Sequence, residues 1–356
     1  MDTERAAPDA VAAPAAAAPA GGKRATIYDV ARLAGVSHQT VSRYLKGYEG
    51  IRPATRERVE QALKALDYRM NMTARSLATR KSNRVAALVH DIVQVGPSKT
   101  AQGASSGAHD AGYVLDFISL DFRDRAAIDE ALELVNRQDL AGVIAMSTTD
   151  EMAAAFAATE FRMPAFIVPE DEDDDDLRSN DPQTVHGHGM KLTVDHLVAL
   201  GHRRFFYIAG PSGWSSARNR AAAYHFALEH HGIASLGEAE GDWSPASGYA
   251  AAHRAAVHTD ATALLVANDQ MALGAMLALE EHGRRVPEDV SVVGFDDIPE
   301  ARFFRPPLTT VRQDFDLQGH IAFGRLLQLI DGPGAYTEPP NVPDLIVRRS
   351  TAPAPR

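Results

Sequence analysis

Polar side chains at the ends of predicted strands have the chemistry to bind a polyhydroxylated ring. Asn268 and Asp296 each lie where a predicted strand ends, Gln313 follows further along the chain, and Trp243 lies in the glycine- and serine-containing segment 240–248. Ligands of open α/β sheets bind beyond the carboxyl ends of the strands. Amides and carboxylates bond hydroxyl groups, and an indole face covers the C–H side of a sugar ring. We therefore expect noncovalent binding of a polyol.

Each of these side chains also has a purely structural interpretation. Asp296 could cap the turn that follows it, and Asn268 could cap a helix that starts at residue 269. Trp243 could belong to the core, although its polar and glycine neighbours favour a loop. Arg220 could be an ordinary surface residue of a helix. The sequence leaves these alternatives open.

A second set of donors lies on one predicted helix face near the N-terminus. Gln39 carries the paired donor and acceptor that bond adenine, and Arg43 carries the paired donors that bond guanine. His38 and Ser42 point the same way, toward solvent. The spacing thus predicts a polar face that can read base edges, with a solvated face of an ordinary α-hairpin as the alternative.

The elements that must hold this face form a helix-turn-helix. Thr26 is placed to cap a first helix, Gly35 allows a sharp turn, and Ser37 is placed to cap a second helix. Val41 and Leu45 then face back to a core at helical spacing. Two helices joined by a short turn with glycine place the second helix in the major groove of DNA.

The segment after this motif has the composition of a DNA-dependent hinge. A third helix is predicted over 53–66, followed by the polar, basic stretch 68–81. Ala74 and Leu77 share a helical face there, but the stretch is too short to be a stable helix alone. A helix that forms on DNA would let Leu77 wedge between base steps in the minor groove. A flexible linker is the alternative.

The charge of the chain is divided in a way that favours DNA binding through one end. The net charge is −11, yet residues 1–81 hold 14 Lys and Arg against 8 Asp and Glu, a balance of +6. The remainder carries −17. DNA needs only a local basic face to release its counterions, and an acidic bulk is repelled by phosphate. We expect the basic module alone to contact DNA.

Several function classes are disfavoured by what the sequence lacks. It has no cysteine, which excludes disulfides and thiolate metal sites and fits a cytoplasmic protein. It has no GxGxxG, Walker or HExxH motif, so neither a nucleotide loop, a metal nor another cofactor is expected. His186 and His188 are the one pair that could suggest an enzymatic site, and we expect both to lie in a loop. We predict that the chain is not an enzyme.

The long second part alternates apolar runs with helical stretches. This alternation predicts α/β lobes with doubly wound parallel sheets, and two sheets suit the length better than one. The expected boundaries are a disordered tail at 1–24, an all-α helix-turn-helix headpiece at 25–70, a hinge helix at 71–81, a core at 82–350 and a tail at 351–356.

Residues 26–81 resemble the headpiece and hinge helix of the LacI/GalR family of transcriptional repressors. The resemblance implies that three side chains read bases: His38, Gln39 and Arg43. It implies phosphate contacts from five others: Thr26, Tyr28, Ser37, Ser42 and Asn71. It also implies that Leu77, beside the small Ala74, is a lever in the minor groove. His38 stands where a tyrosine is found in the family.

The core also resembles that of the family, which is similar to periplasmic sugar-binding proteins. The resemblance implies chain crossovers between the lobes near residues 183, 311 and 341. It further implies effector contacts from seven side chains: Ser216, Arg220, Trp243, Asn268, Asp296, Gln313 and Phe315. Two departures lie in the first lobe, where His90 replaces a serine and Met146 an asparagine.

These observations predict a homodimeric repressor that binds a pseudo-palindromic operator on double-stranded DNA and releases it when a small carbohydrate binds. The leucine-heptad tail that joins dimers into tetramers in the family member with the most similar motifs has no counterpart after Val347. One alternative is a repressor that requires a purine-like corepressor. A second is a sugar-modifying enzyme with an added DNA-binding module.

Overall fold

The computed structural model describes residues 25–45, 47–68, 82–90, 92–121, 125–168 and 185–356, apart from the side chains of residues 256 and 257. The chain divides into two compact units, with the division between residues 80 and 81. The predicted N-terminal tail, the crossover near 183 and the hinge residues Asn71, Ala74 and Leu77 lie outside the described residues.

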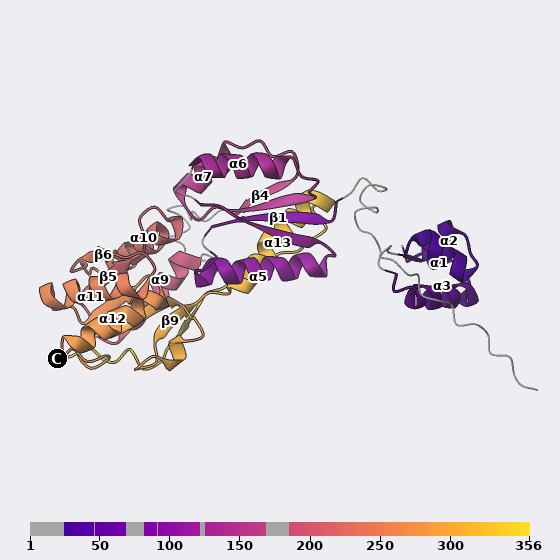
Figure 1. Ribbon diagram of the computed structural model, residues 1–356. Coiled ribbons are helices and arrows are strands. Elements are labelled where there is room, and N and C mark those ends of the chain that lie inside the picture. The colour runs from indigo at the N-terminus through magenta and orange to yellow at the C-terminus, as the bar shows by residue number, and fades with distance from the viewer. Residues whose placement is uncertain (1–24, 46, 69–81, 91, 122–124, 169–184) are drawn as a thin grey trace, which may run out of the picture. The chain divides into compact units, whose positions relative to one another are not determined.

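The N-terminal unit is a three-helix headpiece (Figure 1), comprising α1 (Ile27–Ala34), α2 (His38–Leu45) and α3 (Pro53–Ala65). The predicted start of α1 is confirmed, because Thr26 and Asp29 bond each other reciprocally in a capping box. Gly35 ends α1 in the left-handed conformation, with φ of 62°, and Ser37 Oγ accepts a bond from Thr40 N at 3.1 Å. The chain therefore turns where the sequence predicts.

The first lobe of the C-terminal unit is built on a four-stranded parallel sheet with the order β2-β1-β3-β4. Its elements are, in chain order, β1 (Arg84–Val89), α5 (Val95–Asp110), β2 (Val114–Ser119), α6 (Arg125–Asn136), β3 (Gly142–Met146), α7 (Asp150–Ala157) and β4 (Ala165–Val168). Along β1, Val85 and Ala87 face one core while Ala86 and Leu88 face the other. Helices cover both faces, as a parallel sheet requires (Figure 1).

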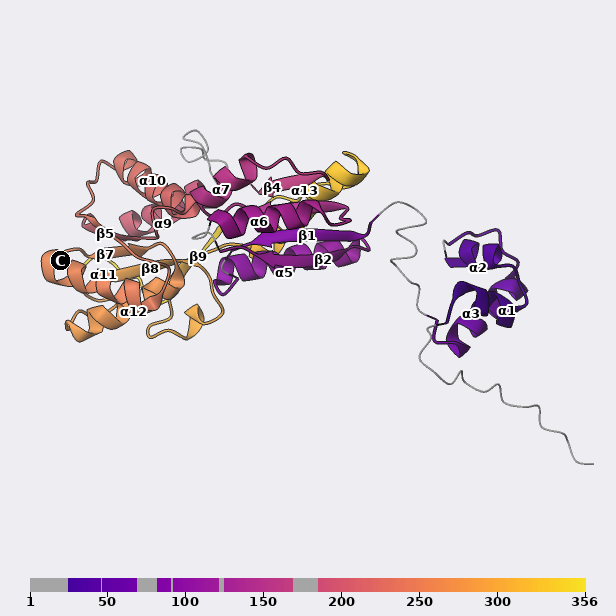
Figure 2. The same cartoon turned by 45° about the horizontal axis from the view of Figure 1, so that its top comes forward.

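The second lobe is built on a six-stranded sheet with the order β10-β9-β8-β7-β5-β6. Its elements are α9 (Val185–Ala199), β5 (Phe205–Ala209), α10 (Ser215–His230), β6 (Glu238–Glu240), α11 (Pro245–His258), β7 (Ala263–Val266), α12 (Asp269–Glu281), β8 (Ser291–Asp296), η1 (Ala301–Phe303), β9 (Thr309–Arg312) and β10 (Asp344–Ile346). Helices α9 and α10 cover one face, and α11 and α12 cover the other (Figure 2). The two predicted parallel-sheet lobes are thus observed, with one difference: β10 pairs antiparallel to β9.

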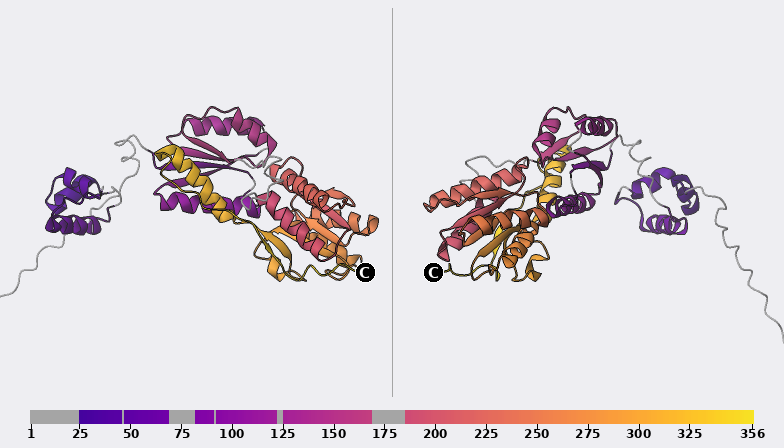
Figure 3. Two further views of the ribbon diagram at one scale, coloured as in Figure 1. Left: turned by 180° about the vertical axis from the view of Figure 1, so that it is seen from behind. Right: turned by 60° about the vertical axis from the view of Figure 1, so that its left-hand side comes forward.

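One helix late in the chain returns to the first lobe. The chain leaves β9 of the second sheet, forms α13 (Phe315–Asp331) against α5, β3 and β4, and comes back to the second sheet at β10 (Figure 3). Two crossovers in the described part of the chain, one between β9 and α13 and one between α13 and β10, therefore link the lobes.

Residues 351–356 differ from the predicted tail, because they pack on the second lobe. Ala352 N donates to Ser291 Oγ at 3.1 Å, and the Ala352 carbonyl lies 3.0 Å from Nε2 of the buried His202. Ala354 N donates to the Leu200 carbonyl at 2.9 Å. These backbone bonds hold the segment in spite of its proline and alanine composition.

Candidate DNA-binding face and effector cavity

The outer face of α2 carries the side chains that the sequence assigned to base reading. His38, Gln39 and Arg43 are exposed and Ser42 is half-buried, whereas Val41 on the opposite side of the helix is fully buried. One side of α2 thus presents donors to solvent while another side closes the core of the headpiece. A helix with this division can enter the major groove without losing its packing.

Three of the predicted phosphate contacts, Thr26, Tyr28 and Ser37, lie around the N-terminal ends of α1 and α2, whereas Ser42 lies in the middle of α2. Thr26 and Ser37 are exposed caps of the two helices, and helix N-termini favour phosphate oxygens. The Tyr28 ring is 61% exposed and its centroid lies 5.1 Å from that of His38. The structure therefore brings a predicted phosphate contact beside a predicted base contact.

A cavity of about 830 Å³ lies in the C-terminal unit and is lined by residues of both lobes. All seven predicted effector contacts line it: Ser216, Arg220, Trp243, Asn268, Asp296, Gln313 and Phe315. Its volume falls within the roughly 300–1,000 Å³ of pockets that hold small organic ligands. Residues that are spread over a hundred positions of sequence thus meet at one site.

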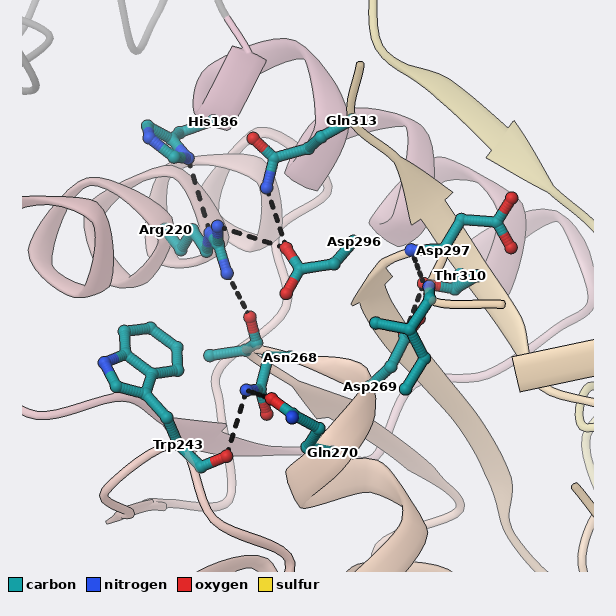
Figure 4. Close-up of polar contacts among 12 residues, drawn as sticks. His186, Arg220, Trp243, Asn268, Asp269, Gln270, Asp296, Asp297, Thr310 and Gln313 are labelled. Carbon is teal, nitrogen blue, oxygen red and sulfur yellow. Dashed lines mark hydrogen bonds and ion pairs between the residues drawn. The ribbon is translucent and has the colours of Figure 1, made fainter. Parts of the chain in front are cut away.

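A buried charge network occupies the second-lobe side of the cavity (Figure 4). Arg220 Nη2 lies 3.4 Å from Asp296 Oδ1, which also accepts a 2.8 Å bond from Gln313 Nε2. Arg220 also donates to the Ala267 carbonyl and, at 3.4 Å, to His186 Nδ1. Arg220 is therefore not an ordinary surface residue, since its guanidinium is enclosed and paired.

Burial and neighbouring charges shift the pKa values of three groups in and beside this network. Burial raises the pKa of Asp296, although the nearby Arg220 lowers it. Burial and the Arg220 charge hold the pKa of His186 well below its usual value, which keeps the imidazole neutral. Burial and the adjacent Asp296 raise the pKa of Asp269 well above its usual value. The network therefore places the Arg220 guanidinium beside the Asp296 carboxyl group, with the Asp269 carboxyl group buried nearby.

Asn268 has both of the roles that the sequence left open. Its Oδ1 accepts a 2.8 Å bond from Met271 N and so caps α12, and its Nδ2 donates to the Trp243 carbonyl at 3.1 Å. The same side chain lines the cavity. Helix capping therefore fixes a donor group at the ligand site, and it also fixes the loop that carries Trp243.

The backbone around the cavity adopts conformations that non-glycine residues rarely take. Trp243, Asp296 and Asp297 have φ values of 70°, 113° and 51°. Such left-handed conformations cost about 1–3 kcal/mol each and gather at binding sites. Hydrogen bonds from Arg348 and Arg312 hold the Asp297 carboxylate, which stabilises the turn after β8. The turn therefore both ends β8 and places the Asp296 side chain at the cavity.

Sequence reasoning missed several residues that line the cavity. Trp214, Gln94 and Phe166 lie on its wall, and so do the two departures noted above, His90 and Met146. The position of Trp214, in a glycine- and proline-containing segment just after a strand, was a signal that could have identified it.

The expectation that His186 and His188 lie in a loop was wrong, because both lie in α9. Gly189, beside His188, lets the helix approach the sheet closely, because a Cβ there would lie 2.9 Å from the Phe295 ring and 3.0 Å from Val311. His186 therefore reaches Arg220 from a helix.

Comparison with known proteins agrees with this combination of a headpiece and a two-lobed core. Residues 26–71 match the pattern of bacterial regulatory proteins of the lacI family, and residues 194–351 match the periplasmic binding protein-like domain. The chain is 37% identical to the lactose operon repressor of Escherichia coli K12, over 94% of this chain and 92% of that protein. The chain belongs to the LacI family.

One further relative and two solved structures also match nearly the whole chain. The HTH-type transcriptional repressor PurR of Haemophilus influenzae is 30% identical over 92% of this chain and 98% of its own length. A crystal structure of the lac repressor dimer bound to operator and the anti-inducer ONPF matches with a TM-score of 0.78 and 36% identity, over 93% of this chain and all of that one. A complex of the regulator CelR with cellobiose matches with a TM-score of 0.63 and 30% identity, over 92% of this chain and all of that one.

Two further observations concern the described residues alone. None of their helices combines the length and the apolar character that crossing a bilayer would require. No group of three His, Asp or Glu side chains in these ranges is arranged to hold a metal ion.

Proposed function

We propose that this protein is a transcriptional repressor of the cytoplasm that binds operator DNA through α2 and releases it when a carbohydrate fills the cavity. The observation that carries the proposal is the enclosed Arg220–Asp296–Gln313 network in a cavity between two lobes. Fixed donors and acceptors of this kind suit the hydroxyl groups of a sugar. A relative named as a repressor and a transcriptional regulator in complex with cellobiose support the same assignment.

The site residues divide into two groups by their chemistry. In the headpiece, His38, Gln39 and Arg43 read base edges, and the remaining predicted contacts hold phosphates. In the cavity, Asp296 accepts from a ligand hydroxyl through Oδ2, because its recorded contacts use Oδ1. Ser216, Asn268 and Gln313 supply further polar contacts, while Trp243 and Phe315 cover the apolar faces of the ligand.

Operator release is tested by measuring how a bound small molecule changes the affinity of the protein for DNA. Duplex DNA is first selected by the protein from a random pool, and its affinity is then measured at fixed salt with monosaccharides, disaccharides and nucleobases. We expect one sugar to weaken DNA binding about 5- to 150-fold, the usual range of coupling between sites. A sugar that binds without changing DNA affinity would refute the proposal. Tighter DNA binding with a nucleobase would establish the corepressor alternative instead.

A second copy of the chain is the proposed occupant of an exposed apolar face on α12. Leu273 and Leu277 are 44% and 50% exposed on this helix, and Phe303 of η1 beside them is 77% exposed. Patches of this kind mark interaction sites, and operator half-sites require paired headpieces. The same face on each copy gives a two-fold dimer.

Replacing Leu273 by glutamate is expected to convert the dimer to a monomer, because two buried carboxylates would face each other at the interface. Sedimentation velocity at micromolar concentration measures the change. Leu236→Glu is the matched control, since Leu236 is similarly exposed (42%) in the loop before β6. If the Leu273→Glu protein remains dimeric, the dimer interface does not lie on this face of α12.

A further inference from the structure

Three aromatic rings meet in the cavity where the two lobes adjoin. The ring centroids of Trp214 and Trp243 lie 5.8 Å apart at an interplanar angle of 74°, and the His90 ring lies 5.8 Å from that of Trp214. His90 follows β1 of the first lobe, and Trp214 precedes α10 of the second. All three line the cavity. The rings therefore form an aromatic corner that spans the junction.

The two tryptophans are placed for different parts of a ligand. Trp243 is only 6% exposed, lies against Gly210, and has the Arg220 guanidinium 5.5 Å above its ring. It thus belongs to the charge network on the second-lobe side. Trp214 is half-buried and presents part of its ring to the cavity. A sugar held by the network leaves Trp214 available for a second unit of the ligand.

The first-lobe side of the cavity carries polar side chains such as Gln94, Thr100 and Thr148, but the part of it formed by three strand residues is apolar. Met146, Phe166 and Val168 lie on this wall. The hydroxyl groups of a second sugar would lose water there without gaining bonds from these side chains. A planar, apolar ring would instead gain both burial and aromatic contact. The cavity, at about 830 Å³, lies near the upper end of the usual range and has room for two units.

We propose that Trp214 is the platform of a second subsite, and that the effector is a glycoside with a flat aromatic aglycone. This inference rests on the proposed function and names its ligand class. The sugar ring occupies the Arg220–Asp296 network, and the aglycone stacks on Trp214 against the first-lobe wall. Trp214 is thereby a specificity-determining residue that selects aryl glycosides over free sugars.

Contacts of the Trp214 backbone link this subsite to the joining of the lobes. Thr149 of the first lobe pairs with Trp214 in an isolated antiparallel bridge, and Asp150 N donates to the Gly213 carbonyl at 3.3 Å. Arg218 then bonds both carboxylate oxygens of Asp150, at 2.8 and 3.0 Å. An aglycone on Trp214 therefore lies where the two lobes are already tied, and it favours this arrangement.

The test compares matched glycosides by titration calorimetry on the full-length protein. The probes are methyl and phenyl β-D-galactosides, methyl and phenyl β-D-glucosides, and cellobiose. We expect the phenyl glycoside of the sugar that binds to be about 2- to 12-fold tighter than its methyl glycoside, the usual contribution of an aromatic pair. Trp214→Ala should bring this ratio close to one, and Trp214→Phe should keep most of it. Phe117→Ala, which removes an exposed ring from β2 outside the cavity, should leave the ratio unchanged.

The outcomes separate this inference from the function on which it rests. Equal binding of phenyl and methyl glycosides, or a ratio unaffected by Trp214→Ala in a protein with a normal thermal transition, overturns the subsite. An equal gain for cellobiose that depends on Trp214 overturns the aromatic class in favour of a second sugar ring. Failure of every glycoside to bind overturns the proposed function itself.

Discussion

Replacing Arg220 by methionine is expected to abolish the response to sugar while operator binding persists. Arg220 bonds or pairs with Asp296, His186 and the Ala267 carbonyl inside the cavity. Removing one member of a buried hydrogen-bonded charge pair weakens binding by about 2–5 kcal/mol, because the remaining charge is left unpaired. Calorimetry with the inducing sugar measures the loss of sugar affinity. The affinity for operator DNA should be the same with and without that sugar.

The matched control separates loss of the ligand site from loss of the fold. Arg220→Met alone leaves the Asp296 carboxylate buried without its cation, which lowers the free energy of unfolding by about 3–5 kcal/mol. The double variant Arg220→Met, Asp296→Leu removes both charges and should recover most of that stability in chemical denaturation. Sugar binding should not return in the double variant. If it did, the network would be structural and the ligand would bind elsewhere in the cavity.

Part of this site could be predicted because strand ends obey a simple rule. Asn268 and Asp296 lie at the carboxyl ends of adjacent strands β7 and β8, so their meeting follows from the alternation of strands and helices. Trp214 and His90 could not be placed in the same way. They come from different lobes and meet only because the chain crosses between sheets, which no local pattern encodes.

The sequence predicted neither the left-handed backbone at Asp296 nor the helical position of His186. A left-handed φ at Asp296 is stabilised by contacts of the next residue, Asp297, with arginines far along the chain. The glycines around His186 are typical of a loop, yet they lie in α9, and Gly189 allows close packing of that helix on the sheet. Tertiary contacts overrode the local preference in both cases.

The fold followed from hydrophobic patterning more completely than the site did. Buried strands such as β1 are continuous apolar runs, so their existence was visible. The three-residue strand β10 and the terminal segment at 351–356 were not, because they lack such a run. They are held by backbone pairing with β9 and by partners such as Ser291 and His202. Edges of a sheet are thus the least predictable part of it.

The largest effect in the headpiece is expected for Arg43→Ala. A paired arginine–guanine contact contributes about 1–3 kcal/mol of discrimination. Because a dimer reads two half-sites, the variant should lose about 2–6 kcal/mol of affinity for DNA selected by the wild-type protein. Fluorescence anisotropy at fixed salt measures this loss, and a repeat of the selection should show relaxed preference at one base pair of each half-site.

The response of non-specific DNA decides whether Arg43 reads a base or only neutralises a phosphate. A base-reading arginine changes affinity for unrelated duplexes only slightly, whereas a phosphate contact weakens all duplexes alike and lowers the salt dependence by about one ion for each copy, or about two ions for the dimer. Arg32→Ala is the matched control, because Arg32 is an exposed arginine of α1 that pairs with Asp29. We expect this variant to bind like the wild type. Equal losses on selected and unrelated DNA for Arg43→Ala would leave sequence reading to Gln39 and His38, whose exposed side chains share the outer face of α2.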